Sequence, residues 1–311
     1  MPKPLMPPLH SPLRWIALAL TVVAACGSAV AKELAPVTHS FLATGGETRI
    51  VGPAGETVWS FPMSTRDGWV LKNGNVLLAV SASKEFPGGG VVEVTRDGQR
   101  QFQWKGTQSE VNTVQPLSKG RILVTEAGPQ PRILELDRKG NILVSIPIQC
   151  QTTNVHMESR MARKLSNGNY LVPQLLDKVV REYTPQGKIV WEVKTPHWPF
   201  TAIRLPNGNT LINCTYGNLS MEVDKKGRTV WELSNSDLPK PYIKDACGAQ
   251  RLPNGNTVIT SYGAKPNEIK LTEVTPSKAV VWTHTDNHPH GIHHFQILDL
   301  NGKKIAWPPL R

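Results

Sequence analysis

The chain has 311 residues, with 35 lysines and arginines, 24 aspartates and glutamates, and a formal net charge of +11 at pH 7. The basic residues are scattered over predicted turns, and no arginine-rich tract is interleaved with aromatics. A nucleic-acid-binding protein is therefore not expected. The length suits one domain with a large core. No segment of useful length has a helical period, which favours an all-β fold.

Residues 1–31 are predicted to be a secretory signal peptide. Lys3 and Arg14 are basic, residues 15–25 form an apolar run too short to span a bilayer, and Ala29-Val30-Ala31 has the small residues of a cleavage site. A periplasmic or secreted protein is expected.

A second interpretation of the leader is that residues 23–26, Val-Ala-Ala-Cys, resemble a lipobox with Cys26 as the lipidated residue. The protein would then be an outer-membrane lipoprotein, anchored only through that lipid. Residues 32–48 are expected to be a short tether in either case.

One hairpin sequence, Leu-Pro-Asn-Gly-Asn-Thr-Leu in its clearest form at residues 205–211, recurs six times. Asn-Gly between apolar runs predicts a tight hairpin, with a type I′ turn that has positive φ at both central residues. Repeats of about 40–48 residues with β character predict a propeller or a solenoid. The six turn glycines are Gly74, Gly120, Gly168, Gly208, Gly255 and Gly302.

A second hairpin, typified by residues 222–232, alternates with the first. Its turn positions are Gly55, Gly98, Gly140, Gly187 and Gly227, with Ser277 taken as the sixth. Most copies end in a tryptophan, and a large aromatic at a repeating position is expected to pack between blades. These tryptophans are Trp59, Trp104, Trp191, Trp231 and Trp282.

Two hairpins make one four-stranded blade, so the sequence predicts a six-bladed β-propeller over residues 49–311. The chain opens with a hairpin of the second type and closes with one of the first. Pairing of the N-terminal with the C-terminal hairpin would complete one blade and leave no long free sheet edge.

Residues just before the strand that opens each blade are predicted to lie at the mouth of the central channel. They differ from blade to blade while the turns repeat, as expected if the turns serve the fold and the mouth serves a ligand. Trp198 precedes such a strand as well. The predicted positions are Arg66, Asn112, Arg160, Phe200, Cys247 and His293, followed by Asp67, Thr113, Met161, Thr201, Gly248 and His294. Arg66, Asp67, Asn112, Arg160, Trp198, Phe200 and His293 are the candidate ligand-binding residues.

Five of the nine histidines fall within residues 284–294. Clustered imidazoles can bind a divalent metal or supply a base or nucleophile near neutral pH. His288, His290 and His293 are the candidate metal ligands, and polar filler in an exposed loop is the alternative. His293 or His294, with His156, are the candidate catalytic residues.

Cys150, Cys214 and Cys247 remain after the leader. A Cys214–Cys247 disulfide across a blade interface and unpaired buried thiols are both open possibilities for an exported chain.

The repeats Leu-Pro-Asn-Gly-Asn-Thr-Leu-Ile and Val-Asp-Lys-Lys-Gly-Arg-Thr-Val-Trp-Glu resemble exported bacterial propellers with pyrroloquinoline-quinone-like repeats and arylsulfate sulfotransferase-like propellers. The resemblance covers roughly residues 46–311. Quinoprotein dehydrogenases have eight blades and adjacent cysteines near the cofactor. This chain has six predicted blades and no Cys-Cys, so pyrroloquinoline quinone is not expected. Arylsulfate sulfotransferases are six-bladed and use a channel histidine that is transiently sulfated. In that family other histidines and an arginine support the channel histidine, and the resemblance implies these parts for His293 or His294 with His156 and Arg160.

Two functional hypotheses follow. The favoured one is a propeller, expected to be a monomer, that binds a small molecule, a glycan or an envelope protein at the channel mouth. The alternative is a channel-histidine enzyme, most concretely a sulfuryl transferase. Whether the protein is an enzyme is left open.

Overall fold

The structure, a computed structural model, describes residues 36–311. The predicted signal peptide and Cys26 lie outside these residues, so export and lipidation stay predictions. Residues 37–311 form one compact unit. In this part of the chain, no helix is long and apolar enough to cross a membrane.

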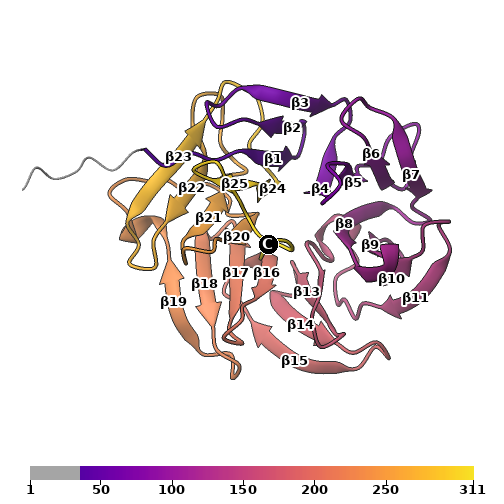
Figure 1. Ribbon diagram of the computed structural model, residues 1–311. Helices are drawn as coiled ribbons and strands as arrows, with labels where there is room; N and C mark the ends of the chain where they lie inside the picture. The colour runs from indigo at the N-terminus through magenta and orange to yellow at the C-terminus, as the bar shows by residue number, and fades with distance from the viewer. Residues whose placement is uncertain (1–35) are drawn as a thin grey trace, which may run out of the picture. The chain divides into compact units, whose positions relative to one another are not determined.

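Six four-stranded antiparallel sheets are arranged as the blades of a β-propeller, as predicted (Figure 1). The strands of each blade are given from the inner strand outward. Blade 1 has β24 (His294–Ile297), β1 (Phe41–Thr44), β2 (Thr48–Val51) and β3 (Thr57–Phe61), and blade 2 has β4 (Thr65–Val70), β5 (Val76–Val80), β6 (Gly90–Val94) and β7 (Arg100–Lys105). Blade 3 has β8 (Glu110–Pro116), β9 (Ile122–Ala127), β10 (Arg132–Leu136) and β11 (Ile142–Pro147). Blade 4 has β12 (Arg163–Lys164), β13 (Tyr170–Gln174), β14 (Val179–Tyr183) and β15 (Ile189–Lys194), blade 5 has β16 (Trp198–Arg204), β17 (Thr210–Thr215), β18 (Leu219–Val223) and β19 (Thr229–Leu233), and blade 6 has β20 (Ala249–Arg251), β21 (Thr257–Thr260), β22 (Ile269–Val274) and β23 (Val280–Thr285).

Five short elements lie outside the four-stranded sheets. They are the 3₁₀ turns η1 (Ser118–Gly120), η2 (Val155–Met157) and η3 (Asn235–Asp237), and a two-stranded ribbon of β25 (Asp299–Leu300) and β26 (Lys303–Lys304).

The ring is closed by pairing of the N-terminal and C-terminal parts of the propeller. The prediction gave two strands from each end, whereas the closing blade has one strand from the C-terminal part and three from the N-terminal part. Only β24 comes from the C-terminal side, and it pairs with β1 in the register Phe41↔Ile297 to Thr44↔His294. Residues 41–44 were assigned to a tether but form β1, because every residue of this strand is buried in the closing blade. The second strand of the C-terminal hairpin pairs in the separate ribbon instead.

The Asn-Gly turns of four blades differ from the predicted type I′ geometry. Gly208 has φ of +86°, whereas Asn207 does not have positive φ. Leu205 and Asn209 bracket a three-residue loop in which the Gly208 amide donates to the Leu205 carbonyl (2.9 Å). A loop of this length takes a type I turn followed by one left-handed residue, so only the glycine needs positive φ. The type I′ prediction is right at Asn301-Gly302, where φ is positive at both residues.

The second hairpins turn as predicted, with one shift of position. The residue with positive φ in the sixth copy is Lys278 (+70°), one place after Ser277. The tryptophans that end these hairpins join neighbouring blades: Trp191 Nε1 donates to the Lys225 carbonyl (2.9 Å), and Trp231 Nε1 to the Pro276 carbonyl (2.9 Å). Their role in packing between blades is therefore as expected.

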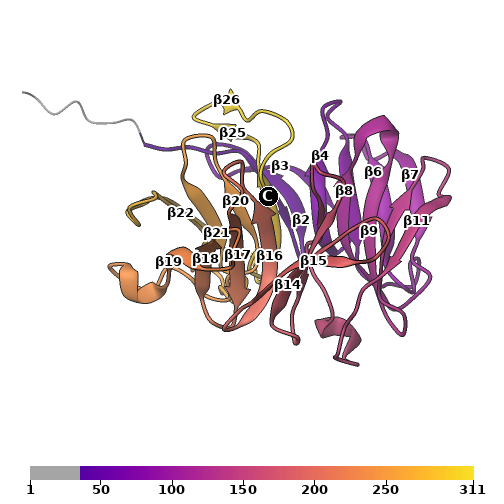
Figure 2. The same cartoon turned by 90° about the horizontal axis from the view of Figure 1, so that it is seen from below.

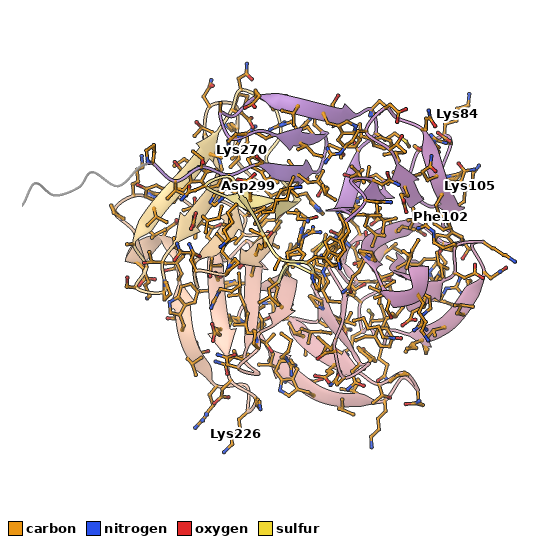
Figure 3. All side chains as sticks on the ribbon, viewed as in Figure 1. Lys84, Phe102, Lys105, Lys226, Lys270 and Asp299 are labelled. Carbon is orange, nitrogen blue, oxygen red and sulfur yellow. The ribbon has the colours of Figure 1, made fainter. Side chains whose placement is uncertain are left out.

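The hydrophobic core lies between the flat faces of adjacent blades. One cluster joins Leu77 and Val91 of blade 2 to Val124 and Leu134 of blade 3, all fully buried. Lysines such as Lys84, Lys105 and Lys226 project from the outer rim (Figure 3), which fits a solvated basic surface.

A polar clamp repeats between blades where the Asn-Gly turns lie. In blade 5, Asn209 Nδ2 donates to Glu222 Oε1 (2.7 Å), and Arg251 of blade 6 donates to Glu222 Oε2 (3.0 Å). At the closure, His39 Nε2 donates to Glu273 Oε2 (2.6 Å) in place of an arginine. A buried carboxylate needs such partners, which explains the second asparagine of Asn-Gly-Asn. The clamp carboxylates are Glu93, Glu135, Glu182, Glu222 and Glu273.

The antiparallel blades give the propeller two distinct faces. We call the end where the inner strands begin the loop face, because the inter-blade connections lie there, and the opposite end the turn face, because the Asn-Gly turns lie there. The ribbon lies at the turn face, and the C-terminus lies between the ribbon and the middle of the ring (Figure 2). Residues 305–311, here called the C-terminal arm, bring the C-terminus to the centre of the ring (Figure 1).

Candidate functional site at the loop face of the channel

Three of the predicted mouth residues are the extra residues of β-bulges. Pairing of the two inner strands skips Arg66 between Thr65 and Asp67, and Asn112 and Phe200 are skipped in the same way in blades 3 and 5. A bulge locally redirects a side chain and is frequent beside functional sites. The repeat thus departs from regular pairing at three of the positions where a site was predicted.

Glu110, a residue missed by the sequence analysis, is the centre of the mouth. His156 Nδ1 lies 2.9 Å from Glu110 Oε1, and the guanidinium groups of Arg66 and Arg160 lie 3.7 and 3.9 Å from this carboxylate. Burial alone would raise the pKa of Glu110, but the hydrogen bond from His156 and the two arginines lower it. Glu110 begins β8, and a carboxylate placed two residues before a predicted mouth position was the available signal.

Arg160 is almost completely buried, with 1% of its surface exposed. It donates through Nη1 to the Ser159 carbonyl (2.8 Å) and through Nη2 to the His156 carbonyl. The Asn112 side chain connects Arg160 to Glu110. Its amide oxygen accepts from Arg160 Nη1 (3.0 Å), and its amide nitrogen donates to Glu110 Oε2 (3.1 Å). Burial, then the nearby charge of Arg66, lowers the pKa of Arg160 to about 10. Arg160 Nε has no hydrogen-bond partner among residues 36–311.

His293 is held in one orientation at the same mouth. Its Nδ1 donates to the Arg66 carbonyl (3.0 Å), and its ring makes edge contacts with Phe200 (4.7 Å between centroids) and Tyr262 (5.2 Å). Burial, together with the charges of Arg66 and Arg160, lowers the pKa of His293 well below its usual value. The ring is therefore neutral with its proton on Nδ1, and Nε2 carries the lone pair.

Aromatic side chains form the rim of the mouth. Trp198 and Tyr216 are in edge contact at 4.5 Å between centroids. Tyr216 and Tyr262 are exposed, at 70% and 44%. Cys247 and Phe200 pack together in one buried cluster beneath them. The mouth thus combines cations, a neutral histidine and apolar walls.

Two predicted site residues belong to the interior of the channel instead. Asp67 Oδ2 accepts from Arg163 Nη1 (2.9 Å), and its Oδ1 accepts from Arg311 Nη2 (2.9 Å). His294 Nδ1 accepts from the backbone amide of Phe295 (2.9 Å) and from Arg311. The predicted residues therefore divide between two places, because strand alternation turns neighbours such as His293 and His294 in different directions.

His288, His290 and His293, the predicted metal ligands, do not converge on one point in this structure. His288 Nδ1 pairs with Glu47. The His290 ring packs against Gly46, because a Cβ added to that glycine would lie 2.8 Å from His290 Cδ2. Only His293 reaches the mouth. Across residues 36–311, no three histidine, cysteine or acidic side chains are grouped closely enough to hold a metal ion.

The histidine loop is instead anchored by a buried lysine. Lys270 is fully buried, and its Nζ donates to Asp286 Oδ1 (2.5 Å) and to the carbonyls of His288 (2.6 Å) and His290 (2.8 Å). Arg49 and His284 also contact Asp286. This network fixes the loop that delivers His293 to the mouth.

The cysteines of the described chain are free thiols, so the Cys214–Cys247 disulfide is not formed. Cys247 Sγ lies 3.7 Å from Thr215 Oγ1 instead. Burial raises the pKa of Cys150 and of Cys214 to about 12 in each case. Such thiols stay protonated and are poor nucleophiles near neutral pH.

Comparison with known proteins gives the fold alone. No protein-family profile and no curated protein matches the chain. A protein of unknown function from Bacteroides caccae has 24% identity and a TM-score of 0.73, over 83% of this chain and 98% of that one. Catalytically inactive virginiamycin B lyase from Staphylococcus aureus with quinupristin has 14% identity and a TM-score of 0.56, over 84% and 92%. A chain from a nidogen–laminin complex has 10% identity and a TM-score of 0.63, over 84% and 98%. At these identities the chain is similar to other propellers in architecture, and the argument for function rests on its own residues.

Proposed function

We propose that the protein binds a small anionic molecule with an aromatic or apolar part at the loop-face mouth. The observation that carries the proposal is the convergence of Arg66, Arg160 and neutral His293 on one aromatic-rimmed opening. Two guanidinium groups lie beside Glu110 at the mouth, and Arg160 Nε has no hydrogen-bond partner among residues 36–311. Guanidinium groups donate paired hydrogen bonds to sulfate, phosphate and carboxylate groups.

Calorimetric titration with phenyl sulfate, with phenol as the neutral counterpart, tests this binding. Phenyl sulfate should bind with the higher affinity, and Arg66→Gln should weaken it roughly tenfold or more, because a charged hydrogen bond is worth about 1.5–3 kcal/mol. Arg228→Gln, at an exposed arginine of the turn face, is the matched control and should leave the affinity unchanged. Equal binding of phenol and phenyl sulfate, or full affinity in Arg66→Gln, would contradict the proposal.

A sulfuryl transferase is the second candidate, and it is favoured by the free lone pair on His293 Nε2. In that reaction Nε2 attacks the sulfur of an aryl sulfate, the sulfur–oxygen bond to the aryl group breaks, and the phenolate leaves. Arg66 and Arg160 would stabilise the charge that develops on the sulfuryl oxygens.

The two candidates are separated by His293→Asn. The asparagine amide keeps a donor for the Arg66 carbonyl but has no atom at the Nε2 position. If the protein is a transferase, 4-nitrophenyl sulfate should add one sulfuryl group to the wild-type protein in mass spectrometry, and His293→Asn should abolish the addition while phenyl sulfate still binds. Binding without any addition to the wild type would leave a binding protein and remove the transferase.

A further inference from the structure

The polar clamp has no glutamate between blades 1 and 2. In blade 2 the clamp residue Glu93 is paired in register with Phe102, whereas in blade 1 the equivalent pair is Ile50↔Trp59. A register shift follows Glu93 and Ile50 in the same way, so the two positions correspond. The basic partner is missing as well, because Val70 stands where blades 4, 5 and 6 have Lys164, Arg204 and Arg251. This interface is therefore apolar, with Ile50 and Val70 in one cluster.

Arg138 shows how an arginine of the second hairpin completes a clamp. It lies two residues before Gly140, the turn glycine of blade 3. Its guanidinium lies 5.0 Å from the centroid of the Phe102 ring, and its Nη2 lies 2.6 Å from Glu93 Oε2. Because Phe102 and Glu93 belong to blade 2, this arginine joins two blades through a carboxylate.

Arg96 takes the same position between blades 2 and 1, but it has no carboxylate partner. It lies two residues before the turn glycine Gly98, and its guanidinium lies 5.7 Å from the centroid of the Trp59 ring. Its Nε donates to the Gly74 carbonyl (2.9 Å), and its Nη groups make no hydrogen bond within residues 36–311. Partial burial lowers the pKa of Arg96, and no acidic side chain of the described chain offsets this. Arg96 is thus the arginine of a clamp whose anion is missing.

A cavity of about 460 Å³ opens at this interface. Arg96 lines it together with the basic residues Lys72 and Lys304 and the acidic residue Asp299. Its apolar lining comes from both blades and from the C-terminal arm, and includes Val70, Leu71, Ile297, Leu298, Ile305 and Trp307. Binding sites for small molecules usually have about 300–1,000 Å³ and mostly apolar walls with a few polar groups. This cavity meets both conditions.

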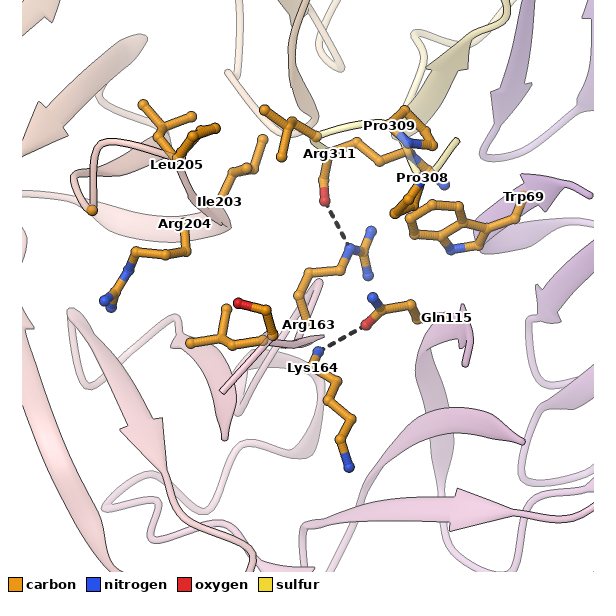
Figure 4. Close-up of a pocket in the computed structure, with 15 residues that line it drawn as sticks. Trp69, Gln115, Arg163, Lys164, Ile203, Arg204, Leu205, Pro308, Pro309 and Arg311 are labelled. Carbon is orange, nitrogen blue, oxygen red and sulfur yellow. Dashed lines mark hydrogen bonds between the residues drawn. The ribbon is translucent and has the colours of Figure 1, made fainter. Parts of the chain in front are cut away.

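A neighbouring cavity beside the same arm shows what distinguishes this one. It has about 490 Å³ and is lined by Arg204 and Arg311, among others (Figure 4). Arg204 pairs with Glu182, and Arg311 pairs with Asp67, so both arginines already have a carboxylate from the chain itself. Arg96 has none, which leaves it available to an anion from outside the chain.

We propose that the cavity between blades 1 and 2 binds a small molecule with one carboxylate and an apolar body. The carboxylate would take the place of the missing clamp glutamate and accept hydrogen bonds from Arg96, because a guanidinium group suits a carboxylate. The apolar body would contact Val70, Leu298 and Trp307. This site shares no residue with the loop-face mouth, so either can exist without the other.

The probe is 4-phenylbutyrate, titrated by calorimetry into the Arg66→Gln variant so that the loop-face mouth does not contribute. One equivalent should bind, and the neutral alcohol 4-phenyl-1-butanol should bind more weakly. A further Arg96→Gln substitution should weaken the binding of 4-phenylbutyrate roughly tenfold or more through the loss of a charged hydrogen bond. Arg138→Gln, at the equivalent arginine that already pairs with Glu93, is the matched control and should leave the affinity unchanged.

Ile50→Glu supplies the missing carboxylate from within the chain, so it should weaken the binding although Arg96 is intact. Urea unfolding checks that this variant is folded, and if it is not, the comparison of Arg96→Gln with Arg138→Gln decides. The proposal is overturned if 4-phenylbutyrate shows no saturable binding, if the alcohol binds as tightly, or if Arg96→Gln and Arg138→Gln change the affinity equally. Full affinity in a folded Ile50→Glu variant would overturn it as well.

Discussion

The two faces of the propeller are built on different principles. At the turn face, the same clamp of asparagine, glutamate and a basic partner links blade after blade, and the turns themselves repeat. At the loop face, the residues at the mouth differ between neighbouring blades, although two of them are arginines, and three inner strands contain a bulge there. The repeated contacts at the turn face stabilise the ring, so the residues at the loop face can vary from blade to blade and serve a ligand.

The comparison has one exception that is instructive. The turn face also gains a cavity, but from the C-terminal arm and not from the repeat. The arm brings Arg311 beside Trp69 and Asp67, two residues of blade 2. The cavity at the turn face and the mouth at the loop face therefore both include residues that break the repeat.

The largest expected effect is at the anchor of the loop face. Lys270→Met should lower the free energy of unfolding by about 3–5 kcal/mol, because it leaves Asp286 and two carbonyls without their buried donor. Urea unfolding measures the change. Lys244→Met, which removes an exposed pair with Glu268, should cost only about 0–1 kcal/mol. Equal costs for the two variants would show that the loop is not anchored by Lys270.

Glycines of the two faces should respond to substitution for different reasons. A Cβ on Gly291, at the loop face, would lie 2.0 Å from the Tyr262 carbonyl oxygen, whereas Gly168, at the turn face, has open space but φ of +91°. Gly291→Ala should cost roughly 1–3 kcal/mol through overpacking, and Gly168→Ala about 1–2 kcal/mol through backbone strain.

Asparagine separates these two causes, because it tolerates positive φ better than alanine but is larger. Gly168→Asn should be more stable than Gly168→Ala in thermal unfolding, and Gly291→Asn less stable than Gly291→Ala. The same order at both sites would remove the distinction between the faces.

The smallest expected effect is the acid sensitivity of the loop-face anchor. Burial alone would raise the pKa of Asp286, but hydrogen bonds from His284 and Lys270 and the charge of Arg49 hold it well below its usual value. A carboxyl with a lowered folded pKa stabilises the fold above its unfolded pKa of about 3.9, and this contribution is lost as the pH falls below that value.

Between pH 4 and pH 3 the loss from Asp286 should be about 1 kcal/mol, since one proton taken up by the unfolded chain changes stability by at most about 1.4 kcal/mol per pH unit. The stability difference between the wild type and Asp286→Asn, measured by urea unfolding, should shrink over this range. A constant difference would show that Asp286 has no special pairing in the folded protein.

Much of the fold was predictable because it repeats. Six glycines at similar intervals predicted six hairpins, and all six have positive φ. The turn type was predicted less well, since loop length decides it and strand ends are not visible in the sequence. The clamp glutamates were present in five of the six copies of the second hairpin but were not recognised, because their partners lie in the next blade, as Arg204 does for Glu182.

The sequence predicted which end of each inner strand would lie at the mouth, but it did not predict every residue that lies there. Counting from the repeat led to Arg66, Arg160, Phe200 and His293, which lie at the same face because each strand that opens a blade begins there. Glu110 and Tyr262 were missed. A histidine-rich segment predicted a metal site, yet its side chains turn to different partners once Lys270 anchors the loop.

The sequence alone was enough to establish the strands, the positions of the turns, the number of blades and the closed ring. These features depend on local turn residues and on the alternation of two hairpin types, and both recur in successive repeats. Tertiary structure decided which residues meet across the channel. It placed Glu110 between Arg66 and Arg160, separated His293 from His294, and brought Arg311 against Trp69. Those contacts join residues far apart in sequence, so they form only when the ring closes and every blade takes its place around the channel.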